Sequence, residues 1–259
     1  MKEKRVTLLK ALALQYDQYS KDQLTAYIVC KNVFVDGVLA TDPRQLVSMS
    51  SSLSFSFDAY VSRGGYKLEH GLKVFGLDVS NLVMLDAGSS TGGFTDCLLK
   101  RGAKLVHSVD VGYNQLDWRL RTNEQVIVHE RQNIMTLTAL EPSCDAAVCD
   151  LSFRSIAGAA SHILSLCRGG YLLSLVKPQF ETPKGLSDFN GVVQDRDLLM
   201  QIMDTVYDLL EDDHVGVHDL ALSPLKGHKG NCEFLALLRQ EQGWTKPRYN
   251  AKVAQLLTL

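Results

Sequence analysis

The chain has 259 residues, which is enough for one large domain or for a medium domain and a small one. Apolar residues make up 46% of the sequence and charged residues 22%, an ordinary globular balance that allows a sizeable core. The formal net charge of −2 excludes a polycation and argues against a nucleic-acid partner, although a local basic face would be enough to bind phosphates.

Cysteine usage and the N-terminus indicate the compartment. No cysteine belongs to a CxxC pair or to a His/Cys cluster with zinc-ligand spacing, so we expect no metal site. Several lie in apolar runs, which favours buried, reduced thiols and therefore the cytoplasm. The cysteines are Cys30, Cys97, Cys144, Cys149, Cys167 and Cys232. Neither a secretory signal nor an apolar stretch of about 18 residues is present, so we expect no membrane segment.

Residues 1–59 are expected to form a compact α+β unit. The predicted elements are a helix over 6–15, a helix over 21–31, a hairpin over 33–39, and a serine-rich loop over 48–56 that leads into a last strand with Leu53, Phe55 and Phe57 alternating. Asp36 and Gly37 join two short apolar runs, which is a strong hairpin signal.

From about residue 60 onward, apolar strands alternate with helices. Strands are predicted over 82–86, 105–110, 126–129, 145–150, 171–176, 215–222 and 232–239, and helices over 94–101, 156–167 and 194–210. This order predicts an α/β domain over 60–245 with a mostly parallel seven-stranded sheet and helices on both faces. The last two strands have no helix between them, so we expect them to pair antiparallel at one edge. Residues 246–259 are expected to be a C-terminal tail, in which a short helix with Val253, Leu256 and Leu257 follows a polar linker.

A glycine-rich turn follows the first strand of this domain. It comprises the candidate cofactor residues Asp86, Gly88, Ser89, Ser90, Thr91, Gly92, Gly93 and Phe94. A P-loop would need a lysine after the glycines, and a dinucleotide fingerprint would need G-x-G-x-x-G, so both fail. A third interpretation is a methyltransferase turn, with Asp110 at the end of the next strand, roughly 20 residues on, binding ribose hydroxyls. A glycine-rich turn with a capping aspartate is the structural alternative.

Four residues are candidates for methyl transfer to a ribose hydroxyl. That hydroxyl must be aligned with the methyl donor and helped to lose its proton, and a partly desolvated lysine among carboxylates can do both. Asp150 and Lys177 end two predicted strands, on the same rim as the glycine-rich turn. Lys67 enters the first helix, and Glu233 starts the last strand. The pattern alone does not bring these two to the rim, and each of the four could instead be a cap or a solvated strand end.

The motifs together resemble a known family. They are YVSRGGYKLEHGL, LDAGSSTGGFTDCLLKRGA, SVDVGYNQL, CDLSF, VKPQFE and GHKGNCEFL, spread over nearly the whole chain. In this order they are similar to the TlyA family, whose members are described as ribosomal RNA 2′-O-methyltransferases, are often called hemolysins, and have a catalytic domain that resembles the FtsJ methyltransferase. The resemblance implies a Rossmann-like fold and S-adenosylmethionine as cofactor.

The resemblance also implies residue roles. It implies a catalytic tetrad of Lys67, Asp150, Lys177 and Glu233, with Lys177 as the base and Asp150 as its orienting partner. It implies cofactor contacts from the turn over 88–93 and from Asp110, and Asn133 as a weaker candidate near the adenine. Ribosomal RNA or ribosomal subunits are the implied partners.

By the same resemblance, residues 1–59 are an S-four type RNA-binding domain, also called αL-type, but their charges depart from that pattern. The basic residues are Lys2, Lys4, Arg5, Lys10, Lys21, Lys31 and Arg44, and the acidic ones are Glu3, Asp17, Asp22, Asp36, Asp42 and Asp58. The two signs nearly cancel, so protein contacts remain an alternative role. Other basic residues that could contribute positive charge are Arg63, Lys73, Lys184, Lys226, His228 and Lys229.

Three functions therefore compete. The first is an S-adenosylmethionine-dependent RNA 2′-O-methyltransferase. The second is a membrane-lytic hemolysin, for which the sequence offers neither a secretion signal nor long apolar segments. The third is a non-catalytic factor that binds the cofactor and RNA or the ribosome.

Overall fold

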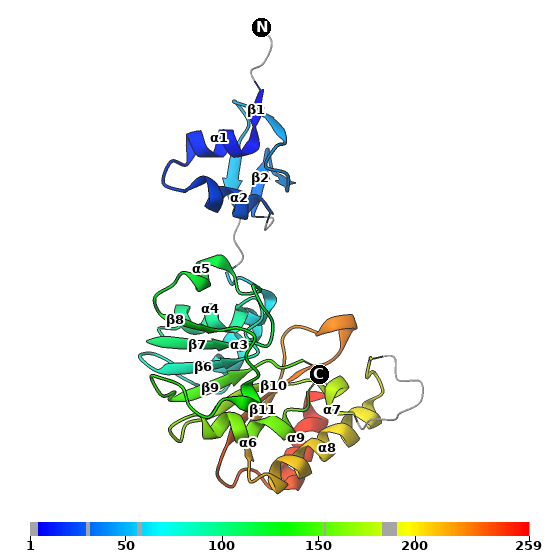
Figure 1. Ribbon diagram of the computed structural model, residues 1–259. Helices are drawn as coiled ribbons and strands as arrows, with labels where there is room; N and C mark the ends of the chain where they lie inside the picture. The colour runs from blue at the N-terminus through cyan, green and yellow to red at the C-terminus, as the bar shows by residue number, and fades with distance from the viewer. Residues whose placement is uncertain (1–4, 30–31, 56–58, 153, 183–190, 259) are drawn as a thin grey trace. The chain divides into compact units, whose positions relative to one another are not determined.

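The computed structural model describes residues 5–29, 32–55, 59–152, 154–182 and 191–258 (Figure 1). The chain divides into two compact units, Met1–Ala59 and Tyr60–Leu259. Cys30, Phe57 and Lys184 lie outside the described residues, as do the charged residues at positions 2–4, 31 and 58.

The N-terminal unit combines two helices with two small sheets. Its elements are β1 (Arg5–Thr7), α1 (Leu8–Gln15), α2 (Lys21–Val29), β2 (Val33–Val35), β3 (Val38–Ala40), β4 (Leu46–Ser48) and β5 (Leu53–Phe55). Strand β2 lies between β3 and β5, and β1 pairs with β4. The predicted hairpin is present, since β2 pairs antiparallel with β3. Asp36 and Gly37, which join the two strands, both have positive φ, as a tight two-residue turn requires.

The structure departs from the sequence prediction in the first helix of this unit and contains a strand that was not predicted. The first helix begins at Leu8 rather than at residue 6, because Arg5–Thr7 pair with Leu46–Ser48 as an antiparallel ladder. Residues 46–48 are for the same reason a strand, although serines dominate the stretch after them. Sheet pairing between distant segments overrides the local helical pattern here.

The second unit is built on a seven-stranded sheet. Its elements are α3 (Arg63–Val74), β6 (Val83–Ala87), α4 (Gly93–Lys100), β7 (Leu105–Val109), α5 (Trp118–Arg121), β8 (Val126–His129), β9 (Ala146–Cys149), α6 (Ala157–Ser165), β10 (Leu172–Val176), α7 (Pro178–Glu181), α8 (Arg196–Asp212), β11 (Gly216–Leu222), β12 (Phe234–Arg239) and α9 (Lys246–Leu256). The strand order is β11-β12-β10-β9-β6-β7-β8, and only β12 runs antiparallel to its neighbours. The predicted mostly parallel sheet with antiparallel last strands is confirmed.

Helices cover both faces of this sheet (Figure 1). Strand β10 shows how the sequence does this, because Leu172 and Val176 point into one core cluster while Leu173 and Leu175 point into the other. Helices α3 and α4 complete the second cluster, and α6, α8 and α9 complete the first. Since both faces are buried, the central strands have near-continuous apolar sequences.

The C-terminal segment contains a helix, as expected, and this helix packs against the second unit. Residues 246–256 form α9, whose Tyr249 and Val253 are almost fully buried in the larger core cluster. Lys246 also pairs with Asp204 and Asp208 of α8. This segment is therefore part of the second unit, and its polar stretches are the solvent-facing side of an amphipathic helix.

Buried His107 and half-buried His129 form a pair between β7 and β8. His107 Nδ1 lies 3.0 Å from His129 Nε2, and His107 Nε2 lies 2.8 Å from the carbonyl oxygen of Pro142. Because a carbonyl only accepts, His107 must carry its proton on Nε2 and accept from His129 on Nδ1. Burial lowers the pKa of both rings, and for His129 the neighbouring His107 lowers it further.

This pair predicts a loss of stability in mild acid. The unfolded histidines take up protons below pH ~6.5, whereas the folded pair resists protonation, so its contribution is present above that pH and is lost as the pH falls. We expect the free energy of unfolding to fall from pH 7.5 to pH 5.5, and to fall less in the His107→Asn/His129→Asn double variant. The exposed His214→Asn variant is the control. Equal pH dependence in wild type and double variant would contradict the prediction.

Candidate active site

The strand ends bring the predicted catalytic residues to one rim of the sheet. Asp110, Asp150 and Lys177 directly follow the parallel strands β7, β9 and β10. Strand β12 runs the other way, and its first residue Phe234 pairs with Val176, the last residue of β10. Glu233 therefore lies beside Lys177 on the same rim. Strand order reverses between β6 and β9, and such switch points are where open α/β sheets bind their ligands.

The glycine-rich turn folds back on the end of β7. The backbone N–H groups of Gly88 and Ser89 both donate to the carbonyl of Val109, over 2.8 and 3.1 Å. Gly92 caps α4 with φ +95°, and a Cβ there would lie 2.3 Å from a methyl group of Leu120. Glycine is therefore required at position 92 both for its conformation and for the space.

Asp110 organises the turn from the neighbouring strand. One carboxylate oxygen accepts from the Ser90 N–H over 2.8 Å, and the other accepts from the Gly112 N–H over 2.6 Å. Each oxygen can accept a further hydrogen bond, and the side chain is only half-buried. Asp110 thus has the position and the capacity to receive ribose hydroxyl groups.

Asp86 lies fully buried beneath the turn. Its Oδ2 accepts from the Thr95 hydroxyl over 2.6 Å, while Oδ1 has no hydrogen-bond partner among the described residues. Burial, with a smaller contribution from the charges of Asp150 and Asp110, raises the pKa of Asp86 to about 7. An unsatisfied buried carboxylate oxygen is costly. It suits a cofactor whose amino-acid end carries an ammonium group.

A cavity of about 390 Å³ opens at this rim. Its lining comprises Gly88, Ser90, Val109, Asp110, Val111, Gln115, Gln132, Asn133, Ile134, Asp150, Leu151, Ser152 and Arg154. The combination of a carboxylate, two amide side chains beside one another and aliphatic side chains fits a ribose and an adenine ring. The residues at this rim therefore fit S-adenosylmethionine.

The cavity includes some predicted cofactor residues and leaves others out. Gly88, Ser90, Asp110 and Asn133 line it, whereas Asp86, Ser89, Thr91, Gly92, Gly93 and Phe94 do not. Phe94 instead packs in the core cluster beneath α3 and α4. Sequence reasoning missed Gln115, Gln132, Ser152 and Arg154. The strand-end argument that selected Asp150 could have found Ser152, which is two residues further on.

Lys177 and Asp150 form an ion pair at the edge of this cavity. Lys177 Nζ lies 2.5 Å from Asp150 Oδ1 and donates to the Ser152 hydroxyl over 3.3 Å. The lysine side chain is only 11% exposed, so its ammonium group is held by protein atoms rather than by water. Asp150 belongs to both the ion pair and the cavity wall, which joins the two parts of the site.

Lys67 and Glu233 form a second, more deeply buried pair. Lys67 Nζ lies 2.5 Å from Glu233 Oε2, and the side chains are 9% and 3% exposed. A Cβ on Gly227 would lie 2.0 Å from Glu233 Oε1, so this glycine lets the β11–β12 connection close over the carboxylate. All four predicted catalytic residues are therefore engaged as two ion pairs at neighbouring strand ends.

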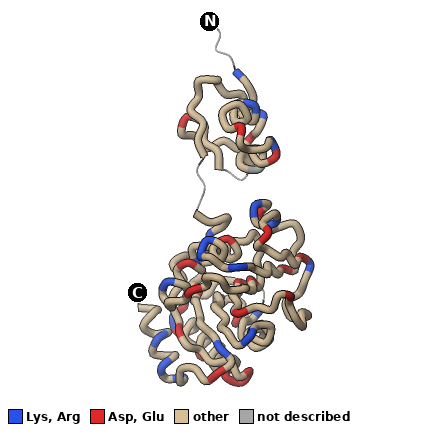
Figure 2. The backbone as a smooth tube through the Cα atoms, turned by 90° about the vertical axis from the view of Figure 1, so that its left-hand side faces the viewer, with Lys and Arg blue, Asp and Glu red and all other residues tan. Residues whose placement is uncertain are grey.

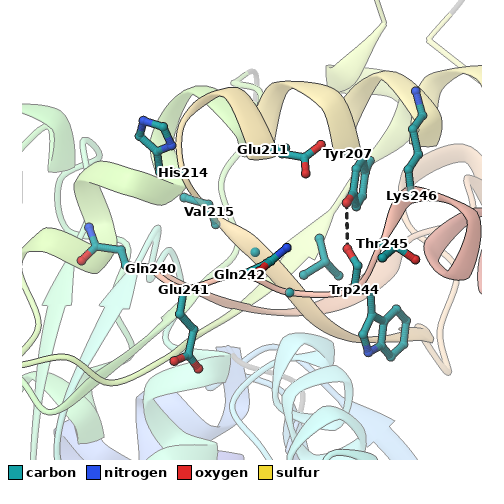
Figure 3. Close-up of a pocket in the computed structure, with 13 residues that line it drawn as sticks. Tyr207, Glu211, His214, Val215, Gln240, Glu241, Gln242, Trp244, Thr245 and Lys246 are labelled. Carbon is teal, nitrogen blue, oxygen red and sulfur yellow. Dashed lines mark hydrogen bonds between the residues drawn. The ribbon is translucent and has the colours of Figure 1, made fainter.

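A second cavity lies at the opposite end of the sheet, where β11 begins and β12 ends. It has a volume of about 460 Å³ and lies between α8 and α9, with Glu211, His214 and Gln242 in its wall (Figure 3). The Tyr207 hydroxyl donates to the carbonyl of Trp244 across one side over 2.7 Å. None of the predicted site residues lines it, so the rim at β6–β10 remains the candidate active site.

Membrane-spanning helices and metal clusters are both absent from the described part of the chain. No helix there is long and apolar enough to cross a membrane. No group of three or more histidine, cysteine, aspartate or glutamate side chains there could hold a metal ion.

The fold and the cavity define the class of the protein, a Rossmann-like methyltransferase that uses S-adenosylmethionine. The chain belongs to the FtsJ-like methyltransferase family, whose model matches residues 60–240. The predicted fold, family and cofactor are therefore confirmed.

Three relatives extend this likeness beyond the catalytic unit. The 16S/23S rRNA (cytidine-2′-O)-methyltransferase TlyA of Mycobacterium tuberculosis is 39% identical over 230 residues, 86% of this chain and 85% of that one. Hemolysin A of Brachyspira hyodysenteriae is 36% identical over 222 residues, 84% of this chain and 92% of that one. A solved structure described as a hemolysin, from Streptococcus thermophilus, is 32% identical with a TM-score of 0.73 and covers 98% of this chain and 96% of that one.

Proposed function

We propose that this protein transfers a methyl group from S-adenosylmethionine to a ribose 2′-hydroxyl of ribosomal RNA. The observation that carries the proposal is the Lys177–Asp150 ion pair, in which the two side chains lie 2.5 Å apart and Asp150 belongs to the wall of the cofactor cavity. The Mycobacterium tuberculosis relative, named as an rRNA (cytidine-2′-O)-methyltransferase, supports the choice of substrate.

In this proposal Lys177 is the group that takes the proton from the ribose hydroxyl. The bound cofactor supplies an electrophilic methyl group. Asp150 and Ser152 hold the lysine nitrogen in place, so that proton transfer and methyl alignment depend on one fixed atom.

The Lys67–Glu233 pair serves in this scheme to position the acceptor. Both side chains are buried and paired with each other, so each is held by the other and not by water. Since Glu233 lies beside Lys177 across the β10–β12 ladder, the second pair borders the place where the ribose must sit. We assign Lys67 and Glu233 to holding the ribose in line with the methyl group.

The mouth of this site carries exposed basic residues, although the chain as a whole has a net charge of −2. Arg63, Arg154 and Lys226 are exposed in three segments that border it: the start of α3, the segment after β9, and the β11–β12 connection. The described acidic residues of these segments and of α7 are already engaged, Asp150 and Glu233 by lysines and Glu181 by hydrogen bonds. Phosphates of an RNA acceptor would meet cations there.

The N-terminal unit offers a weaker electrostatic attraction. Its described residues carry both signs in equal number, and Arg44 lies 3.5 Å from Asp42 (Figure 2). We therefore assign most of the electrostatic attraction for RNA to the mouth of the catalytic unit. The N-terminal unit is proposed to contribute shape-dependent or protein contacts.

The salt dependence of RNA binding tests this assignment. Each phosphate contact to single-stranded RNA adds about 0.7 to the slope of log affinity against log salt concentration. The Arg63→Gln/Arg154→Gln/Lys226→Gln variant should therefore lose about 2 from that slope. The matched control, Lys10→Gln/Lys21→Gln/Arg44→Gln, should lose less. A larger loss in the control variant would place the phosphate contacts on the N-terminal unit instead.

Labelled S-adenosylmethionine tests the proposed activity. The protein is incubated with ribosomes, separate subunits or bare ribosomal RNA, and label in the RNA is counted. We expect label in at least one of these substrates. Tight cofactor binding with no label in any of them would favour a non-catalytic RNA-binding or ribosome-binding factor.

A further inference from the structure

A single buried carboxylate links the two segments that carry the Lys177–Asp150 pair. Glu181 ends α7, the short helix that begins directly after Lys177. Its Oε1 accepts from the Ile156 N–H over 2.8 Å, and its Oε2 accepts from the Ser155 hydroxyl. Ser155 and Ile156 lie beyond Asp150 in the segment between β9 and α6. Glu181 therefore joins the segment after β10 to the segment after β9.

The contacts close a ring around the ion pair. One side of the ring is the direct contact between Lys177 and Asp150, and the other side is the contact of Glu181 with Ser155 and Ile156. The chain joins these two sides through α7, which follows β10, and through the segment from Asp150 to Ser155, which follows β9. Since Ser152 within the second connection also binds Lys177, a shift of either segment would change the surroundings of the lysine nitrogen.

Glu181 is buried, so it is not simply a solvent-exposed cap at the start of α6. The residue is 9% exposed, and no lysine or arginine in the described part of the chain pairs with it. Burial raises the pKa of Glu181, and the hydrogen bonds from Ser155 and Ile156 partly oppose that shift. A carboxylate kept in such a place without a counter-ion must be matched by strong local hydrogen bonds. The start of α6 supplies them, together with its helix dipole.

We infer that Glu181 is a positioning residue, whose carboxylate fixes the segment after β9 against the segment after β10 and so sets the geometry of Lys177 and Asp150. The catalytic part of this inference rests on the proposed methyltransferase function. Glu181 does not line the cofactor cavity, so its effect should appear in the rate of methyl transfer and not in cofactor affinity.

The test compares Glu181→Ala with a matched loss of a helix cap elsewhere. Asp195 caps α8 by accepting from the Leu198 N–H over 2.7 Å, so Asp195→Ala also removes a carboxylate from the start of a helix. We expect Glu181→Ala to lower kcat by about 10- to 100-fold, as small misplacements of reacting groups do. Its cofactor Kd should stay near the wild-type value. Asp195→Ala should lower the melting temperature without lowering kcat.

A chemical readout that needs no RNA accompanies the kinetics. Acetic anhydride modifies exposed neutral amines, and mass spectrometry reports the modification of Lys177 by position. We expect Lys177 to be several-fold more reactive in Glu181→Ala than in wild type or in Asp195→Ala. The milder Glu181→Gln and Ser155→Ala variants, which each keep part of the contact, should show intermediate reactivity and replace the alanine variant if it does not fold.

The outcomes separate this inference from the proposed function. Unchanged Lys177 reactivity and unchanged kcat in Glu181→Ala, with only a lower melting temperature, would overturn the positioning role. Wild-type protein that never labels RNA would overturn the proposed function, while the reactivity of Lys177 would still decide the role of Glu181.

Discussion

Replacing Lys177 with alanine is expected to slow methyl transfer by about 10²- to 10⁴-fold, the range that a positioned general base contributes. The lysine does not line the cofactor cavity, so the Kd for S-adenosylmethionine should stay near its wild-type value. Single-turnover rates with saturating cofactor and RNA measure the first quantity, and calorimetric titration of the cofactor measures the second.

The Lys177→Arg variant separates proton transfer from ion pairing. Arginine can still pair with Asp150, but it does not give up its proton in proteins. We expect Lys177→Arg to be as slow as Lys177→Ala. An arginine variant with near wild-type activity would show that Lys177 holds charge and does not act as a base.

Replacing Asp110 with alanine is expected to weaken cofactor binding by about 10- to 100-fold, which corresponds to the loss of charge-assisted hydrogen bonds. The substitution removes the proposed acceptor for the ribose hydroxyls. It also releases the N–H group of Gly112 and that of Ser90, which lines the cavity. Calorimetric titration with S-adenosylmethionine and with its demethylated product should show the same loss for both ligands.

Asp117→Ala is the matched control for that experiment. Asp117 belongs to the same connection after β7, where it caps α5 and pairs with Arg119, but it does not line the cavity. We expect its cofactor affinity to stay close to wild type. Equal losses in the two variants would mean that Asp110 acts by ordering the connection and not by contacting the cofactor.

The fold of the second unit could be predicted because its strands are buried on both faces. Continuous apolar runs such as the one that forms β10 identify a central strand without knowledge of its partners. Short elements could not be found in the same way. Strand β1 exists because it pairs with β4, about 40 residues away, so it has no sufficient local signal.

The site could be predicted to a similar extent, because some of its residues lie at the ends of central strands and others do not. Asp110, Asp150 and Lys177 follow from the rule that ligands bind at the carboxyl ends of parallel strands. The Lys67–Glu233 pair joins residues 166 positions apart, and only the antiparallel placement of β12 brings Glu233 to the rim. Glu181 ends the motif VKPQFE, but the motif did not indicate its role, because a buried glutamate resembles any surface glutamate in the sequence until its hydrogen bonds are seen.

Nucleoside analysis of the methylated RNA tests the central claim most directly. Ribosomal RNA treated with wild-type protein and S-adenosylmethionine is digested to nucleosides, and mass spectrometry distinguishes a methyl group on the ribose from one on the base. We predict a 2′-O-methylated nucleoside that is absent after treatment with Lys177→Arg. A methyl group on a base, or ribose methylation that persists in the Lys177→Arg variant, would contradict this account of the site.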